Sequence, residues 1–152
     1  MWKKWIIATV AVFVSWQILD YVIHSVILMD TYGETSELWR PMEEMKMGLM
    51  LVVTLIAAGA FCAVYAWLIA PKDLMPGVWY GLIWGVGAGI SMGYGTYAVQ
   101  PLPYILPLVW FLGTVVEAVV AGVIVALIVK APVASDEAAP SAPEPAAEAG
   151  AE

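Results

Sequence analysis

Three ionisable side chains interrupt otherwise apolar stretches of this chain: Asp20, His24 and Glu117. A charged group inside a bilayer is unfavourable by about 3 kcal/mol on insertion scales, so such residues are candidates for function by default. Carboxyl and imidazole groups can exchange protons or bind a divalent cation. Asp20 and His24 are four residues apart, which places both side chains on one face of a helix.

The same polar face extends along the depth of a membrane. Gln17 lies one helical turn before Asp20. With a rise of about 1.5 Å per residue, Glu117 lies near the middle of its apolar stretch, and Asp20 and His24 lie about 5 and 10 Å nearer the outer surface. Tyr94 falls at a depth comparable to that of His24. We therefore expect an intramembrane polar site of Gln17, Asp20, His24, Tyr94 and Glu117.

Three interpretations of this polar site stay open. In the first it is structural: Asp20 and His24 pair with each other and with Tyr94 or Tyr97, while Glu117 stays protonated. In the second it conducts protons or a small solute, with Glu117 as the central exchangeable group. In the third His24 binds a metal or cofactor together with Asp20 and Glu117. No HxxxH, ExxH or CxxC pattern supports the third, so metal and cofactor are left unassigned.

Motifs of the common enzyme classes do not occur in a suitable context. The serines have no GxSxG surroundings, and the GxGxG pattern at Gly85, Gly87 and Gly89 lies inside an apolar stretch. A dinucleotide-binding turn would instead join a strand to a helix. The sequence therefore favours a protein that is not an enzyme.

The composition indicates an integral membrane protein. Of the 152 residues, 62% are hydrophobic and only 12% are charged, whereas soluble domains carry about 25% charged residues. The mean hydropathy is +0.86. The net charge is −7, and no basic patch indicates binding to nucleic acid. The lipid bilayer is the first expected partner.

Four apolar segments predict an all-α domain over residues 1–130, a bundle of four transmembrane helices. The expected spans are 5–28, 47–70, 76–99 and 105–129, each long enough for a hydrocarbon core of about 30 Å. This topology gathers most of the basic side chains, Lys3, Lys4, Lys72 and Lys130, on one side, and leaves Arg40 and Lys46 on the other. By the positive-inside rule both termini are cytoplasmic, in the cytoplasmic (inner) membrane.

Five glycines recur at intervals of four in the third segment. We call them the glycine ladder: Gly77, Gly81, Gly85, Gly89 and Gly93. Residues four apart share one face of a helix, so this face carries no side chains. In membrane proteins such faces allow two helices to pack with their backbones in close approach. We expect the glycine ladder to be a helix-packing surface whose outer end lies beside Asp20 and His24.

The last segment, residues 131–152, differs abruptly from the rest. It is rich in alanine, proline and acidic residues and has no aromatic side chain. Such a composition buries too little apolar surface to offset chain entropy, and the prolines interrupt any helix. The sequence predicts a disordered acidic tail on the cytoplasmic side.

Short motifs in residues 1–130 resemble a group of small bacterial four-span membrane proteins of uncharacterised function. The resemblance consists of Asp20-x3-His24, the element Trp39-Arg40-Pro41, Tyr97 before a proline-bearing turn, and Glu117. It implies a fold and a membrane location, and it supplies no activity.

Taken together, these features favour a non-enzymatic membrane protein that is either an accessory subunit or self-associating. Its partner is then a second copy of the chain or a larger membrane complex. The alternative is a small proton- or solute-conducting transporter that uses Asp20, His24 and Glu117.

Overall fold

The computed structural model describes residues 1–130, and the tail predicted over 131–152 lies outside this range. Every regular element in the described range is helical. The elements are α1 (Trp2–Val22), η1 (Ile23–Ile27), α2 (Met29–Glu34), η2 (Ser36–Leu38), η3 (Met42–Glu44), α3 (Met47–Leu68), α4 (Leu74–Gly89), η4 (Ile90–Tyr94), α5 (Gly95–Tyr97) and α6 (Ile105–Val129). Of these, η1 and η4 are π-helical, and η2 and η3 are single 3₁₀ turns.

Within residues 1–130, three helices are long and apolar enough to cross a membrane: Trp2–Ile27, Met47–Leu68 and Ile105–Val129. The prediction of an all-helical, membrane-type chain is confirmed at this level. The fourth predicted segment, 76–99, is helical from Leu74 to Tyr97 through α4, η4 and α5 but is not one of these three. Its many glycines lower its hydropathy, because glycine contributes no apolar side chain.

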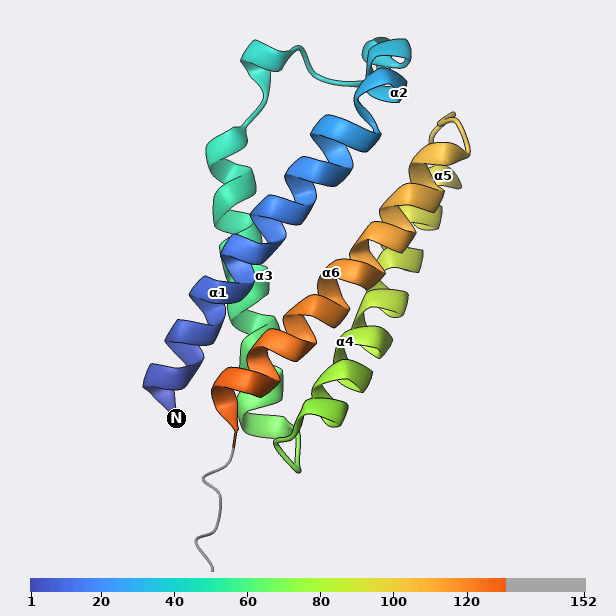
Figure 1. The fold of residues 1–152 in the computed structure, drawn as a ribbon. Coiled ribbons are helices and arrows are strands. Elements are labelled where there is room, and N and C mark those ends of the chain that lie inside the picture. Colours follow the sequence, from blue (N-terminus) through green and yellow to red (C-terminus); the bar gives the residue numbers. More distant parts are fainter. Residues whose placement is uncertain (131–152) are drawn as a thin grey trace, which may run out of the picture.

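The helices form an elongated bundle with two distinct ends (Figure 1). At one end, which we call the lysine end, Lys4 Nζ donates a hydrogen bond of 2.9 Å to the carbonyl oxygen of Lys130. The turn that carries Lys72 lies at this end too. The opposite end, which we call the loop end, carries the connections 28–46 and 98–104. The N-terminus and the end of α6 are therefore neighbours.

The turn between α3 and α4 starts the glycine-rich helix earlier than expected. Asp73 caps this helix, because its Oδ1 accepts a hydrogen bond of 2.7 Å from the backbone N–H of Leu74. We expected Pro76 to open the helix; it lies instead in the first turn, where its missing N–H leaves no intrahelical bond unmade.

The glycine ladder lies against α6 along most of the length of that helix. A Cβ atom at Gly77 would lie 2.5 Å from the carbonyl oxygen of Gly122, and one at Gly93 would lie 2.7 Å from that of Pro107. A Cβ at Gly81 would overlap the Ala118 carbonyl oxygen. The two backbones are so close that side chains have no room between them, which is the geometry that small residues permit in membranes.

Two apolar clusters fill the bundle, one toward each end. The cluster in the lysine half includes Phe61, Tyr65 and Tyr80 together with small residues of α1, α3 and α6. The hydroxyl groups of its tyrosines donate to backbone carbonyls, Tyr80 to Phe61 at 2.9 Å and Tyr65 to Asp73 at 2.7 Å. The cluster at the loop end is built on Ile23, Leu28, Leu102 and Leu106. The polar residues of the predicted site lie between these two apolar clusters.

Candidate functional site

Asp20, His24 and Glu117 line one cavity of about 440 Å³. This volume falls within the roughly 300–1,000 Å³ that is typical of small-molecule sites. The other lining residues come from all the long helices: Trp16, Met50, Val53, Thr54, Ala57, Trp84, Ala88, Met92, Thr96, Trp110, Thr114 and Ala118. The cavity is thus a feature of the whole bundle, and three of the five predicted site residues meet in it.

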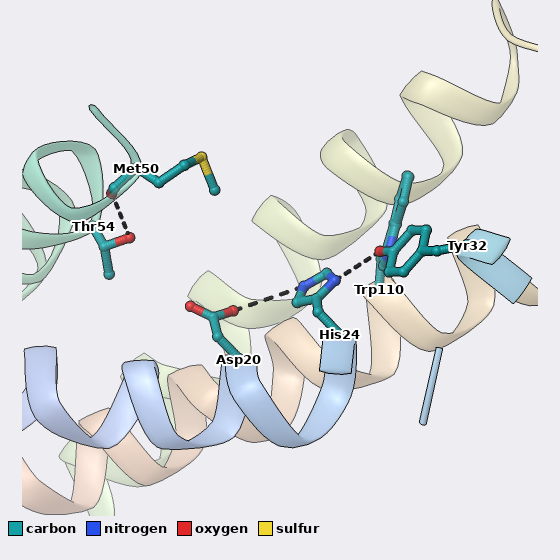
Figure 2. Close-up of polar contacts among 6 residues, drawn as sticks. All are labelled: Asp20, His24, Tyr32, Met50, Thr54 and Trp110. Atoms are coloured by element: carbon teal, nitrogen blue, oxygen red, sulfur yellow. Dashed lines mark hydrogen bonds and ion pairs between the residues drawn. The ribbon is translucent and has the colours of Figure 1, made fainter. Parts of the chain in front are cut away.

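The end of α1 and the start of η1 present Asp20 and His24 to the cavity. The Nε2 atom of His24 lies 3.8 Å from Oδ1 of Asp20. On its other side, Nδ1 of His24 lies 2.7 Å from the hydroxyl oxygen of Tyr32, and the two rings stack at an interplanar angle of 17°. Figure 2 shows these side chains in a row that ends at Trp110.

Tyr32 links His24 to Trp110 through hydrogen bonds. The Tyr32 oxygen accepts a hydrogen bond of 2.8 Å from Nε1 of Trp110. Burial raises the pKa of the Tyr32 phenol above its usual value, so the hydroxyl keeps its hydrogen at neutral pH. In the arrangement in which this hydroxyl donates to Nδ1, a neutral His24 carries its own hydrogen on Nε2, the nitrogen that faces Asp20.

Glu117 lies at the deep side of the cavity, near the middle of α6. Its backbone carbonyl accepts a hydrogen bond of 3.0 Å from Nε1 of Trp16. Its side-chain Oε1 is buried and makes no hydrogen bond within the described part of the chain. Asp20 supplies the second carboxyl group of the same cavity. Two ionised carboxylates in one desolvated cavity repel each other, so a proton or another positive charge stabilises the pair.

Two π-helical segments border the cavity. His24 belongs to η1, and Met92 belongs to η4 on the opposite wall. A π-turn inserts extra backbone into a helix and changes the direction of the side chains that follow, and such turns are frequent at functional sites. The sequence patterns of α1 and α4 gave no sign of either segment.

The wall formed by α3 is loose. The first buried residue of α3 is Ala58, so the turns before it pack little against the other helices. Met50 and Thr54 line the cavity from this part of α3, and Figure 2 shows them apart from the row that begins at Asp20. The hydroxyl of Thr54 donates to the carbonyl oxygen of Met50 in its own helix. The α3 side is therefore the least closely packed wall of the cavity.

Two of the predicted site residues lie elsewhere. Gln17 does not line the cavity; Trp16, its neighbour in α1, does. Tyr94 also lies outside the lining, and its hydroxyl lies 3.1 Å from that of Tyr104. The residue that reasoning from the sequence missed is Tyr32. It lies eight residues after His24 and beyond residue 28, where the predicted first span ends, so helical spacing alone did not assign it to the site.

Metal binding finds no support in the geometry. Within residues 1–130, no group of three or more His, Cys, Asp or Glu side chains is arranged to hold a metal ion. No protein-family model, curated protein or solved structure matches the chain. The cavity is therefore interpreted from its own chemistry, which consists of a histidine held by a tyrosine and two carboxyl groups.

Proposed function

We propose that this protein is a non-enzymatic, four-span protein of the cytoplasmic membrane that binds a small ligand at the polar cavity, as an accessory or self-associating bundle. The observation that carries this proposal is the meeting of Asp20, His24 and Glu117 in one cavity. Two carboxyl groups and a histidine without a nucleophile or a metal cluster suit binding better than catalysis.

The arrangement of the helices supports a fourth crossing. The continuous helical stretch Leu74–Tyr97 packs along α6 through the glycine ladder. At 1.5 Å per residue it is about 36 Å long, enough for a hydrocarbon core of about 30 Å. The lysines gathered at the lysine end then favour a cytoplasmic position for that end. The cavity lies toward the opposite, outer side.

The shape of the cavity favours binding over conduction. Toward the lysine end the cavity meets Trp16 and Trp84, and both rings pack edge-on against Phe61, with centroid distances of 5.8 and 5.7 Å. Phe61 is completely buried. A cavity closed on its inner side can hold a ligand but offers no path through the bundle.

Conduction remains the second candidate because of one observation. Asp20, His24 and Tyr32 form a polar row from the cavity to the loop end, with 2.7 Å between His24 Nδ1 and the Tyr32 oxygen and 3.8 Å between His24 Nε2 and Asp20 Oδ1. Such a row can pass protons by alternating donor and acceptor roles. Proton flux in liposomes separates the two candidates.

Accessibility of the cavity to water provides a direct test of the proposal. In a background with Cys62→Ala, which removes the buried native thiol, Ala88→Cys places a thiol in the cavity wall. We expect a charged methanethiosulfonate reagent added from outside to modify it at least about tenfold faster than Ala121→Cys, because only a hydrated thiol forms the reactive thiolate. Ala121 is completely buried in the lysine half.

A second control is Ala60→Cys, which lies on the exposed face of α3 and does not line the cavity. In a bilayer this face meets lipid, so its thiol is expected to react as slowly as that of Ala121→Cys. Equal rates for Ala88→Cys and Ala60→Cys would count against a hydrated cavity and therefore against the proposed function.

The accessory or self-associating role has its own test. The exposed turns of α3 between Met47 and Ile56 are almost entirely apolar, which suits contact with another membrane helix as well as with lipid. Native mass spectrometry after gentle extraction is expected to show a mass above the 16.4 kDa of one chain. A monomer without any bound protein would rule out this part of the proposal.

A further inference from the structure

Several hydrogen-bond donors of the cavity lining are already bonded to acceptors of the protein and are not available to a ligand. The indole N–H of Trp16 donates to the carbonyl oxygen of Glu117, and that of Trp110 donates to the hydroxyl of Tyr32. Both indole rings line the cavity. Their apolar faces are therefore available to a ligand, whereas their N–H groups already have partners in the protein.

Two of the three threonines that line the cavity, Thr54 and Thr96, behave in the same way. The hydroxyl of Thr54 donates to the carbonyl oxygen of Met50 at 3.0 Å, and that of Thr96 donates to Met92 at 2.6 Å. A hydroxyl that donates its single hydrogen keeps lone pairs for accepting. These two side chains present acceptors, and not donors, to the cavity.

The two acidic side chains of the lining favour a ligand that carries a positive charge. Asp20 and Glu117 both line the cavity, and Oε1 of Glu117 is buried without a hydrogen-bond partner in residues 1–130. The side chain of Asp20 is 41% exposed, so a ligand can reach it. A positive charge placed between the two carboxyl groups would stabilise both of them in the ionised form.

The remaining lining selects the kind of cation. Trp16, Trp84 and Trp110 line the cavity, and indole faces attract weakly hydrated organic cations. Met50 and Met92 add soft, adaptable apolar surface. A small metal ion would need a compact cluster of oxygen or nitrogen ligands, and none is present in the described residues. The chemistry therefore matches a cation that carries apolar groups.

We propose that the cavity binds a lipophilic organic cation, with its charge between Asp20 and Glu117 and its apolar groups against the tryptophans. This inference rests on the proposed function and names the ligand class of the same site. The loosely packed α3 wall, where no residue before Ala58 is buried, gives such a ligand a way in from the lipid. A lipophilic cation collects in that lipid because its apolar groups partition from water.

Equilibrium dialysis with radiolabelled tetraphenylphosphonium tests this inference on the full chain in detergent micelles, with empty micelles subtracted. We expect saturable binding to the wild type that falls at least about tenfold in Glu117→Gln, and also in Asp20→Asn, since the loss of one charge in a desolvated site is worth at least about 1.4 kcal/mol. Asp30→Asn removes the same kind of charge outside the cavity and is expected to bind as the wild type does.

Ala57→Trp tests the same site without a change of charge. Ala57 lines the cavity, so the added indole occupies ligand space and should abolish binding, whereas Ala60→Trp on the exposed face of α3 should not. If an acid variant does not elute as a folded protein in gel filtration, the comparison of Ala57→Trp with Ala60→Trp still tests the site.

Three outcomes would overturn the inference. They are equal binding of the isosteric anion tetraphenylborate, equal competition by the hydrophilic cation tetramethylammonium, and unchanged tetraphenylphosphonium binding in all the cavity variants. Absence of tetraphenylphosphonium binding to a wild type whose Ala88→Cys thiol is reactive would reject the ligand class and leave a hydrated binding cavity. An unreactive Ala88→Cys thiol would reject the proposed function itself.

Discussion

Gly81→Leu is expected to separate α4 from α6 and to lower the free energy of unfolding by about 3 kcal/mol. A Cβ at this position already overlaps the carbonyl oxygen of Ala118 and lies 2.8 Å from its carbonyl carbon. The clashing atoms are backbone, so no side chain can rotate to make room and the helices must move apart. Thermal unfolding in detergent, followed by circular dichroism, measures this loss.

Gly87→Ala is the matched control in the same helix. No heavy atom lies within 4 Å of a Cβ built at Gly87. Alanine is also the better helix former by about 1 kcal/mol, so this variant should be as stable as the wild type or slightly more stable. If Gly81→Leu unfolded no more easily than Gly87→Ala, close packing of the two backbones would not be what holds α4 to α6.

The contrast between these glycines shows how far sequence reasoning extends. Intervals of four predict one smooth helical face, and the structure places Gly77, Gly81 and Gly93 of that face against α6. The choice of α6 as the neighbour was beyond prediction, because the apolar segments 47–70 and 105–129 both carry small residues at intervals of four. Which two faces meet depends on the fit of whole helices, and periodicity does not contain that information.

Spacing and depth predicted that Asp20, His24 and Glu117 lie near one another, and the role of these residues stays a prediction. The four-residue separation of Asp20 and His24, and the central position of Glu117, were enough to expect a shared location, and all three line the cavity. Gln17 fits the same spacing yet lies outside the lining. Whether the side chain of Gln17 faces the cavity depends on how α1 is rotated about its axis. Packing against the neighbouring helices sets that rotation.

Tyr32 and the π-helical segments mark the limit of the prediction. The predicted first span ends at residue 28, whereas the chain continues as α2 from Met29 and brings Tyr32 to His24. A π-turn forms where tertiary contacts favour it over the α-helical bond pattern. Nothing in the local residue types distinguishes η1 or η4 from the helix around them.

Phe61→Ala is expected to destabilise the bundle and to open the inner side of the cavity. Phe61 is completely buried, and its ring centroid lies 4.5 Å from that of Tyr80, in addition to its edge contacts with Trp16 and Trp84. Removal of a buried phenyl group in a packed core lowers the free energy of unfolding by about 3 kcal/mol. Phe13→Ala, which removes a partly buried ring from the same cluster, should lower it less.

Proton flux into pyranine-loaded liposomes then shows whether Phe61 closes a path. We expect background flux for the wild type, because the aromatic rings around Phe61 separate the polar cavity from the lysine end. Phe61→Ala should raise the flux severalfold, and adding Glu117→Gln should reverse the rise, because it removes the ionisable carboxyl group on the deep side of the cavity. Substantial wild-type flux that Glu117→Gln abolishes would instead establish conduction as the function. In that case the packing around Phe61 would have to open during each transport event, and the binding site proposed here would be one stage of that path.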